Sequence, residues 1–305
     1  MKTRLLYLVG GLLLISSVAF SQDYVFKILT NSKGENTYKT SSSDWTPLKT
    51  GTKLNSGDEI KTTGDCYVVL LSSNGKLLEL KEPKDYKVDE LKSQVGGGDD
   101  GVISKYADFV MSKMSADSKE ENRKKYASVT GATQRGFSQI KFFMASSANI
   151  YNSIAIIRWK AQDDATDYEI SLMDWFGEPL MVAETSDSFY QIDFTDEKLK
   201  DLEMVIVNVS VKGEEETSSG DYAIQLVNTE DSKEYSVELE TLKSSLDENL
   251  PISNLILAEF YEQNDLLLDA LTSYERAIQD APEIDYFKEA YREFLMRNGY
   301  NDSIE

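Results

Sequence analysis

The stretch from Trp45 to Val88, WTPLKTGTKLNSGDEIKTTGDCYVVLLSSNGKLLELKEPKDYKV, decides the fold of the N-terminal part of the chain. Four glycines divide it, and each gap between them holds a short run typical of a strand. Residues 66–71, CYVVLL, form a continuous apolar run, as expected for a strand covered on both faces. Asn74 and Gly75 tolerate the positive φ angles that a tight hairpin requires. The stretch therefore predicts a small β-roll or barrel.

The order of residues in this stretch resembles that of the FecR-type extracytoplasmic domain. A Trp is followed by Pro-Leu, by Gly-x-x-Leu-x-x-Gly-Asp-x-Ile-x-Thr, by an apolar strand and by Asn-Gly-x-x-x-x-Leu. The matching positions are Trp45, Pro47, Leu48, Gly51, Leu54, Gly57, Asp58, Ile60, Thr62, Asn74, Gly75 and Leu80. The resemblance covers about residues 24–90 and implies a β module in the cell envelope. Residues 129–136, VTGATQRG, look like a segment that often trails such domains.

The best-known FecR-type proteins are transmembrane signal regulators that contact an anti-sigma pathway in the cytoplasm. In this chain only residues 1–4 precede the hydrophobic segment, so we do not expect a cytoplasmic sensor helix. From the resemblance we therefore expect a β module, and we do not infer a regulatory role.

Residues 1–21 have the pattern of a secretory signal peptide. Lys2 and Arg4 precede the apolar residues 5–15, and small residues lead to Ser21. The apolar run is too short for a stable membrane anchor, and no cysteine near the cleavage site indicates lipidation. We expect cleavage between Ser21 and Gln22, which would leave a periplasmic or secreted protein without a stable membrane span.

The predicted mature chain is strongly acidic, with 30 Lys and Arg against 53 Asp and Glu, a net charge of −23. Nucleic acids and anionic membranes would repel such a protein, so neither is an expected partner. The charge keeps the chain soluble and could favour cationic partners or divalent ions. A solvated acidic surface accounts for it equally well and is the simpler interpretation.

Missing residue types exclude several classes of enzyme. The chain contains no histidine, which removes Ser-His-Asp and Cys-His mechanisms and zinc sites with histidine ligands. Cys66 is the only cysteine, so no intramolecular disulfide forms, and its apolar strand predicts a buried inert thiol. Gly96-Gly97-Gly98 lacks the Lys and Ser of a P-loop. We predict no catalytic residue, no cofactor site and no metal site.

Acidic loops and exposed aromatics are the remaining candidates for chemistry or binding. Asp99-Asp100, Asp163-Asp164 and Glu214-Glu215-Glu216 lie in expected turns, where solvated charges are the simplest interpretation, and calcium binding in one of these loops is the alternative. A carboxylate pair of the glycosidase kind leaves no recognisable sequence signal. Trp175 and Phe176 could stack on a sugar, although we expect them to pack at a strand end.

The middle of the chain predicts a linker and a second β module. Residues 96–147 form the linker, with an amphipathic helix over residues 102–114 and a solvated charged run at 119–125. Residues 148–228 change to a period of two, most clearly from Val205 to Val211. This pattern predicts an antiparallel β-sandwich. Its inward Trp159 resembles the core Trp of immunoglobulin-like or fibronectin-like domains, although their disulfide is absent.

Residues 229–305 return to a helical period. A capping box at Asp231 and Glu234 opens the first helix, Pro251 starts the second, and Asn298-Gly299 ends the last. Seven residues fall at the spacings of a tetratricopeptide repeat: Leu257, Ala258, Tyr261, Ala270, Tyr274, Ala277 and Pro282. Asn254 departs from that pattern, where a large aromatic is common. The repeat-like part covers about residues 253–298, and one repeat needs a neighbour to pack on.

These observations predict a multidomain α+β protein with five parts. They are a signal peptide (1–21), a FecR-like β domain (22–95), a linker with a helix (96–147), a β-sandwich (148–228) and a helical repeat bundle (229–305). We expect a non-enzymatic envelope protein that acts as an interaction scaffold or adaptor, binding an envelope protein through its helical repeat. The alternative is an envelope glycan or cell-wall binding protein that acts through a β module. The residues that bind the partner are not identified by the sequence.

Overall fold

A computed structural model describes residues 24–96, 101–129, 140–228 and 232–300. The predicted signal peptide, Asp99-Asp100 and Asp231 lie outside the described residues. At the level of fold class the prediction is confirmed: the protein is α+β. Antiparallel sheets occupy the N-terminal half, a mixed sheet follows, and a group of four helices ends the chain.

The first β module contains two four-stranded antiparallel sheets. One has the order β4-β1-β6-β7, formed by Lys53–Leu54, Phe26–Lys33, Tyr67–Ser72 and Leu77–Leu80. The other has the order β3-β2-β5-β8, formed by Thr46–Pro47, Thr37–Lys39, Glu59–Lys61 and Asp85–Lys87. Helix α1 (Val88–Gln94) follows β8 directly and buries Val88 and Leu91 in the core between the sheets.

Strand β6 is buried along its whole length, as its continuous apolar sequence predicts. Val68 and Leu70 point into the core of the first module. Tyr67, Val69 and Leu71 point to the other face and belong to the core of the helices. The hairpin to β7 turns at Gly75, where φ is +80°. One strand thus contributes to two hydrophobic cores.

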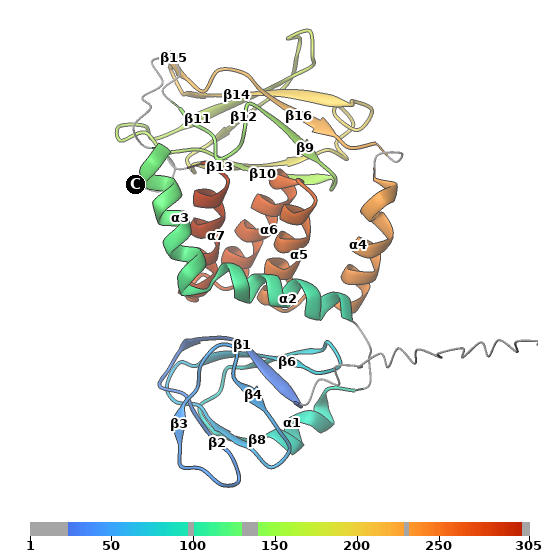
Figure 1. Ribbon diagram of the computed structural model, residues 1–305. Coiled ribbons are helices and arrows are strands. Elements are labelled where there is room, and N and C mark those ends of the chain that lie inside the picture. The colour runs from blue at the N-terminus through green and yellow to red at the C-terminus, as the bar shows by residue number, and fades with distance from the viewer. Residues whose placement is uncertain (1–23, 97–100, 130–139, 229–231, 301–305) are drawn as a thin grey trace, which may run out of the picture.

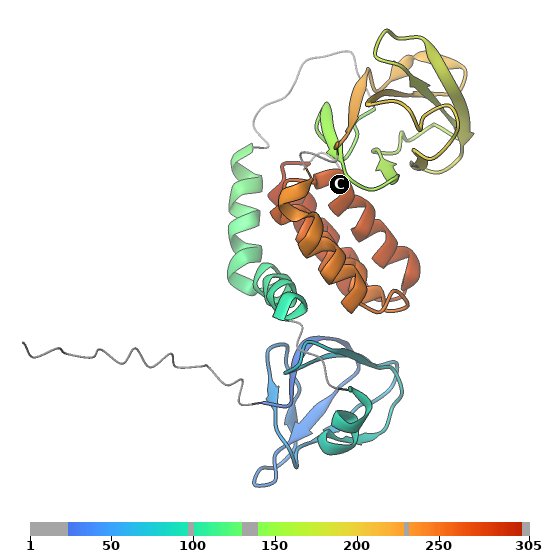
Figure 2. The ribbon, with the colours of Figure 1, turned by 90° about the vertical axis from the view of Figure 1, so that its right-hand side faces the viewer.

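Six helices form a layer between the two β modules (Figure 1). Helices α2 (Gly101–Lys113) and α3 (Ala116–Val129) come before the second β module in the sequence. Helices α4 (Lys233–Ser245), α5 (Pro251–Gln263), α6 (Leu267–Asp280) and α7 (Asp285–Arg297) come after it. Figure 2 shows α2 and α3 lying along one side of the C-terminal four. The predicted helix start at Pro251 and helix end at Asn298-Gly299 are confirmed.

Most described side chains of the charged run at 119–125 are exposed, as predicted, but the run lies within helix α3, and two of its side chains contact α7. The Nζ atom of Lys119 lies 2.7 Å from Oε1 of Glu289. The side-chain amide of Asn122 donates to Oε2 of Glu293 at 2.7 Å, and both residues are buried. These two contacts between α3 and α7 are polar, so they leave no apolar stripe in the sequence of α3.

The second β module consists of two facing sheets. Strands β10 (Ile154–Arg158) and β13 (Phe189–Asp193) form one. The other has the order β12-β11-β14-β16-β9, formed by Pro179–Thr185, Tyr168–Met173, Met204–Val211, Tyr222–Leu226 and Ser147–Ile150, with β15 (Glu214–Ser218) beside β14. Strand β9 runs parallel to β16, so this sheet is mixed, where we predicted a purely antiparallel one. Trp159 is 1% exposed, as predicted.

No helix in the described parts of the chain is long and apolar enough to cross a membrane.

Candidate functional site

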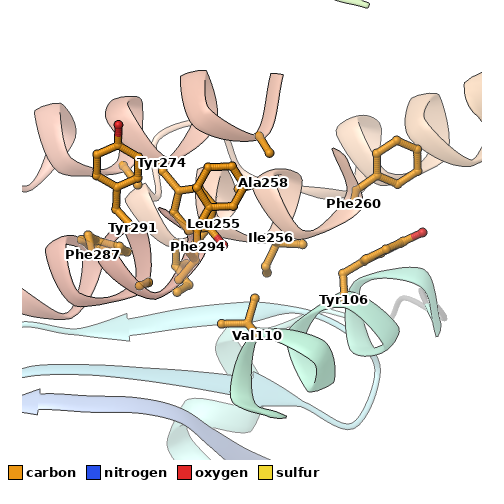
Figure 3. Close-up of a cluster of buried hydrophobic side chains, with 14 of the residues drawn as sticks. Tyr106, Val110, Leu255, Ile256, Ala258, Phe260, Tyr274, Phe287, Tyr291 and Phe294 are labelled. Carbon is orange, nitrogen blue, oxygen red and sulfur yellow. The ribbon is translucent and has the colours of Figure 1, made fainter. Parts of the chain in front are cut away.

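Helices α5 and α6, which the sequence predicts to form a tetratricopeptide-like repeat, are covered by other parts of the same chain. Helix α5 packs against α2. Between them the rings of Tyr106 and Phe260 meet edge to face, with centroids 5.4 Å apart (Figure 3). Helix α6 contacts α5, α7 and strand β10. Its Leu268 enters the core of the second β module. Helices α5 and α6 therefore pack on the second β module and on the other helices, and little of their surface remains for a partner.

A buried polar cluster joins helix α6 to the second β module. The carboxylate of Asp269 accepts the backbone N–H groups of Tyr151 and Asn152 at 2.8 and 2.9 Å and the Asn152 side-chain amide at 2.6 Å. That amide also donates to the hydroxyl oxygen of Tyr261, and Lys243 donates to Asn152 at 2.9 Å. The loop between β9 and β10 is thereby fixed on the helical layer.

Burial raises the pKa of Asp269 to about 6, although the N–H groups of Tyr151 and Asn152 and the charge of Lys243 lower it. An acid with this pKa could exchange protons near neutral pH, but Asp269 is 1% exposed and a substrate cannot reach it. Its role here is to fasten the loop. Asp269 was not among the predicted residues; its signal in the sequence is a lone carboxylate inside the apolar run from Leu266 to Leu271.

An ion pair lies at the same junction. Arg158, the last residue of β10, donates through Nε and Nη2 to the two carboxylate oxygens of Glu275 on α6, the second bond being 2.7 Å long. The guanidinium also lies over the ring of Phe189 at 5.0 Å. Burial opposes the charge on Arg158, but its hydrogen bond to Glu275 leaves its pKa raised. The side chain of Glu275 is 2% exposed, so the pair is largely removed from water.

A second buried charge cluster fastens α2, α5 and α7. Lys113 lies 2.9 Å from Glu259 and 3.1 Å from Glu262. Arg297 contacts Glu262 at 2.8 Å. Burial opposes ionisation of Glu262, but the two cations hold its pKa below its usual value. Glu259 is 1% exposed, and burial raises its pKa. These contacts hold the helices together, and the two carboxylates are largely removed from water.

The first β module is attached to the other side of the helical layer. The rings of Tyr67 on β6 and Phe287 on α7 meet edge to face, with centroids 5.8 Å apart. Lys27 on β1 contacts Asp108 on α2 at 2.8 Å. Both β modules are therefore joined to the helical layer by apolar and charged contacts, the first through α2 and α7 and the second mainly through α6.

A cleft of about 660 Å³ opens between the first β module and the helices. Strand β1, the turn at Thr50-Gly51, the end of α2, the start of α3 and the first turns of α7 line it. The ion pairs Lys27–Asp108 and Lys119–Glu289 lie in its walls, and Met111 and Met114 supply flexible apolar surface. Such a mixed lining suits a polypeptide better than an apolar small molecule.

The acidic loops are dispersed. Asp163 and Asp164 are exposed in a turn, as predicted. Glu214 begins strand β15, so the turn expected there lies at Lys212-Gly213 instead. Within the part of the chain that the structure describes, no three acidic or cysteine side chains come close enough to hold a metal ion. Cys66 is 5% exposed, and its Sγ lies 3.8 Å from the carbonyl oxygen of Leu80.

The expected strand-end packing of Trp175 and Phe176 is wrong. The two side chains are 64% and 76% exposed at the turn between β11 and β12. That turn extends beyond the core, so neither ring finds apolar partners other than its neighbour, 4.8 Å away between centroids.

No protein-family model matches the chain, and a search of curated proteins finds no significant relative. The resemblances to FecR-like, immunoglobulin-like and tetratricopeptide-like modules therefore stay predictions.

Proposed function

We propose that the chain is an exported, non-enzymatic envelope protein that works as a protein–protein interaction scaffold. Its helical layer would hold two β modules in a fixed arrangement and present the cleft between the first module and the helices to a protein partner. Three regions distant in sequence build that cleft: β1, the α2–α3 corner, and α7 of the C-terminal helical part. This joint construction is the observation on which the proposal rests.

The finer assignments of the modules belong to this proposal. The first module would be a FecR-like roll and the second an immunoglobulin- or fibronectin-like sandwich, in support of which two sheets enclose the buried Trp159. Helices α5 and α6 would be one tetratricopeptide-like repeat, used internally. The location would be the periplasm or the medium outside the cell, with cleavage near Ser21. A partner that meets the C-terminal helices would reach them through α7, since α5 and α6 are covered.

Photo-crosslinking in intact cells tests the cleft. A photoreactive residue replaces Ser112, an exposed residue of the cleft wall, and a control chain carries it at Glu197, which is 85% exposed on the second β module. We expect the Ser112 chain to capture one or two envelope proteins that the Glu197 chain does not. The charge reversal Lys119→Glu, which breaks the contact to Glu289, should reduce that capture.

Equal capture from both positions, or capture unaffected by Lys119→Glu, would contradict the docking site. Deleting residues 253–305 is a poor test, because α5, α6 and α7 supply much of the main hydrophobic core and their loss would unfold the chain. Circular dichroism of the Lys119→Glu protein provides the folding control.

The alternative function, a glycan-binding protein that acts through a β module, gains one supporting observation. Trp175 and Phe176 are exposed on the second β module, and aromatic rings are common contacts for sugars. Retention on purified envelope polysaccharide that is lost on Trp175→Ala would favour this alternative over the scaffold.

A further inference from the structure

The hairpin between β11 and β12 concentrates exposed apolar surface. Of the five large hydrophobic side chains that are exposed in the described parts of the chain, three lie here: Trp175 (64%), Phe176 (76%) and Val182 (56%). Soluble proteins expose single apolar residues routinely, whereas a local group of them indicates an interaction site.

The turn that carries the aromatic pair is well defined. One carboxylate oxygen of Asp174 accepts the backbone N–H groups of Phe176 and Glu178, both at 2.9 Å. Gly177 adopts φ +85°, which permits the tight return to β12. The two rings stand at 61° to each other. They therefore project as a rigid wedge and do not form the flat platform that would favour a sugar ring.

Strand β12 beside this wedge is the end of its sheet. Among the described residues it pairs only with β11, so the backbone N–H and C=O groups along its other side have no strand partner. Edge strands are usually protected by charge, proline or a bulge. Here Pro179 and the bulge at Leu180 protect only the start of the strand, and the following residues 181–183 are uncharged and pair regularly with β11. This edge is open to an added strand.

Charge identifies the kind of strand that fits. Residues 140–228 contain 17 Asp and Glu against 6 Lys and Arg, whereas residues 24–96 contain 10 against 11. Glu178 and Glu184 flank the uncharged centre of β12. A second copy of this chain would bring like charges together at the edge, which is unfavourable, and a basic segment would bring opposite ones.

We propose that the β12 edge and the Trp175–Phe176 wedge form a docking site for an extended, basic segment of a partner protein. The segment adds to the sheet beside β12 through backbone hydrogen bonds. Its apolar residues contact the wedge and Val182, and a Lys or Arg residue pairs with Glu178, since Glu184 is already paired with Lys212. This site is separate from the cleft, so either proposal can fail alone.

Peptide selection on the mature protein (residues 22–305) tests this. A displayed library of random ten-residue peptides is selected against it, and the enriched peptides are synthesised with a fluorescent label. We expect them to combine apolar residues with at least one Lys or Arg. Trp175→Ala/Phe176→Ala and, separately, Glu178→Lys should each weaken binding at least about tenfold, in line with the loss of an anchoring residue. Trp45→Ala on the first module, at an exposed aromatic, should leave it unchanged.

Hydrogen exchange distinguishes strand addition from simple contact with the wedge. Bound peptide should slow deuterium uptake over residues 179–185 and leave the other edge strand, β9, unaffected. Enriched peptides without basic residues, binding without protection of β12, or failure to enrich any peptide would overturn the proposal. Retention on envelope polysaccharide that Trp175→Ala/Phe176→Ala abolishes, with no peptide enriched, would assign the wedge to a glycan instead.

Discussion

Arg158 and Glu275 offer a sharp test of how the second β module is fixed to the helices. Replacing Arg158 with Met leaves the carboxylate of Glu275, 2% exposed, without its cation. Breaking a buried pair in this way costs about 3–5 kcal/mol of unfolding free energy, and the partial exposure of Arg158 places our expectation near about 3 kcal/mol. Glu275→Met should cost less, about 1–2 kcal/mol, because Arg158 is 24% exposed and can reach water.

The double variant Arg158→Met/Glu275→Met should recover most of the loss, since no uncompensated charge then remains. Urea unfolding, followed by circular dichroism and by tryptophan fluorescence, measures all three variants, and coincident transitions justify a two-state analysis. Lys124→Met is the control. It breaks the exposed pair with Glu120 and should change the unfolding free energy by less than about 0.5 kcal/mol. A cost below about 1 kcal/mol for Arg158→Met, or a double variant as unstable as the sum of the singles, would refute the reasoning.

Three further predictions concern separate parts of the chain. Burial raises the pKa of Asp269 to about 6, so the contribution of this residue to the free energy of unfolding is greatest below about pH 4 and is lost as the pH rises through 6. Unfolding midpoints should therefore change with pH between pH 4 and 7.5, and Asp269→Asn should reduce that change. An unchanged pH dependence in Asp269→Asn would disprove this. The thiol of Cys66 should resist a thiol reagent in the native protein and react once urea unfolds it, whereas fast native labelling would contradict its burial. Mass spectrometry of the exported protein should give Gln22 as the first residue, and an intact N-terminus would disprove signal cleavage.

Local signals predicted the elements well where one residue type dictates backbone geometry or periodicity. Asn74-Gly75 predicted the β6–β7 hairpin, although only Gly75 of the pair adopts a positive φ in the turn. The strict alternation from Val205 to Val211 gave β14, whose side chains alternate between buried and half-buried. Pro251 marked the start of α5, because proline lacks the N–H that a first helical residue does not use.

These local patterns could not predict contacts between distant parts of the chain. Lys119 and Asn122 meet α7 more than 160 residues away, and polar contacts of this kind leave no periodic apolar stripe in α3. Asp269 was not predicted for the same reason, because the backbone N–H groups that it accepts lie on another module, distant in the sequence. The exposure of Trp175 and Phe176 was missed for the opposite reason: an aromatic pair in a turn packs inward only if the surrounding loops are long enough to cover it.

The order of the helices along the chain also constrains how the protein comes to be assembled. Helix α2 contacts α4 and α5. Tyr106 can therefore form its contacts with Glu238 and Phe260 only after these residues are synthesised, more than 130 residues later. In the meantime the strands between Ser147 and Leu226, which pair only among themselves, can form their own sheets. The part of the apolar face of α2 that packs on α4 and α5 is left uncovered throughout this interval, whereas the part that meets β1 is not, and closing such a long loop is slow. A nascent chain that stops before α5 therefore exposes apolar surface of α2. We expect the protein to depend most on chaperones at this stage.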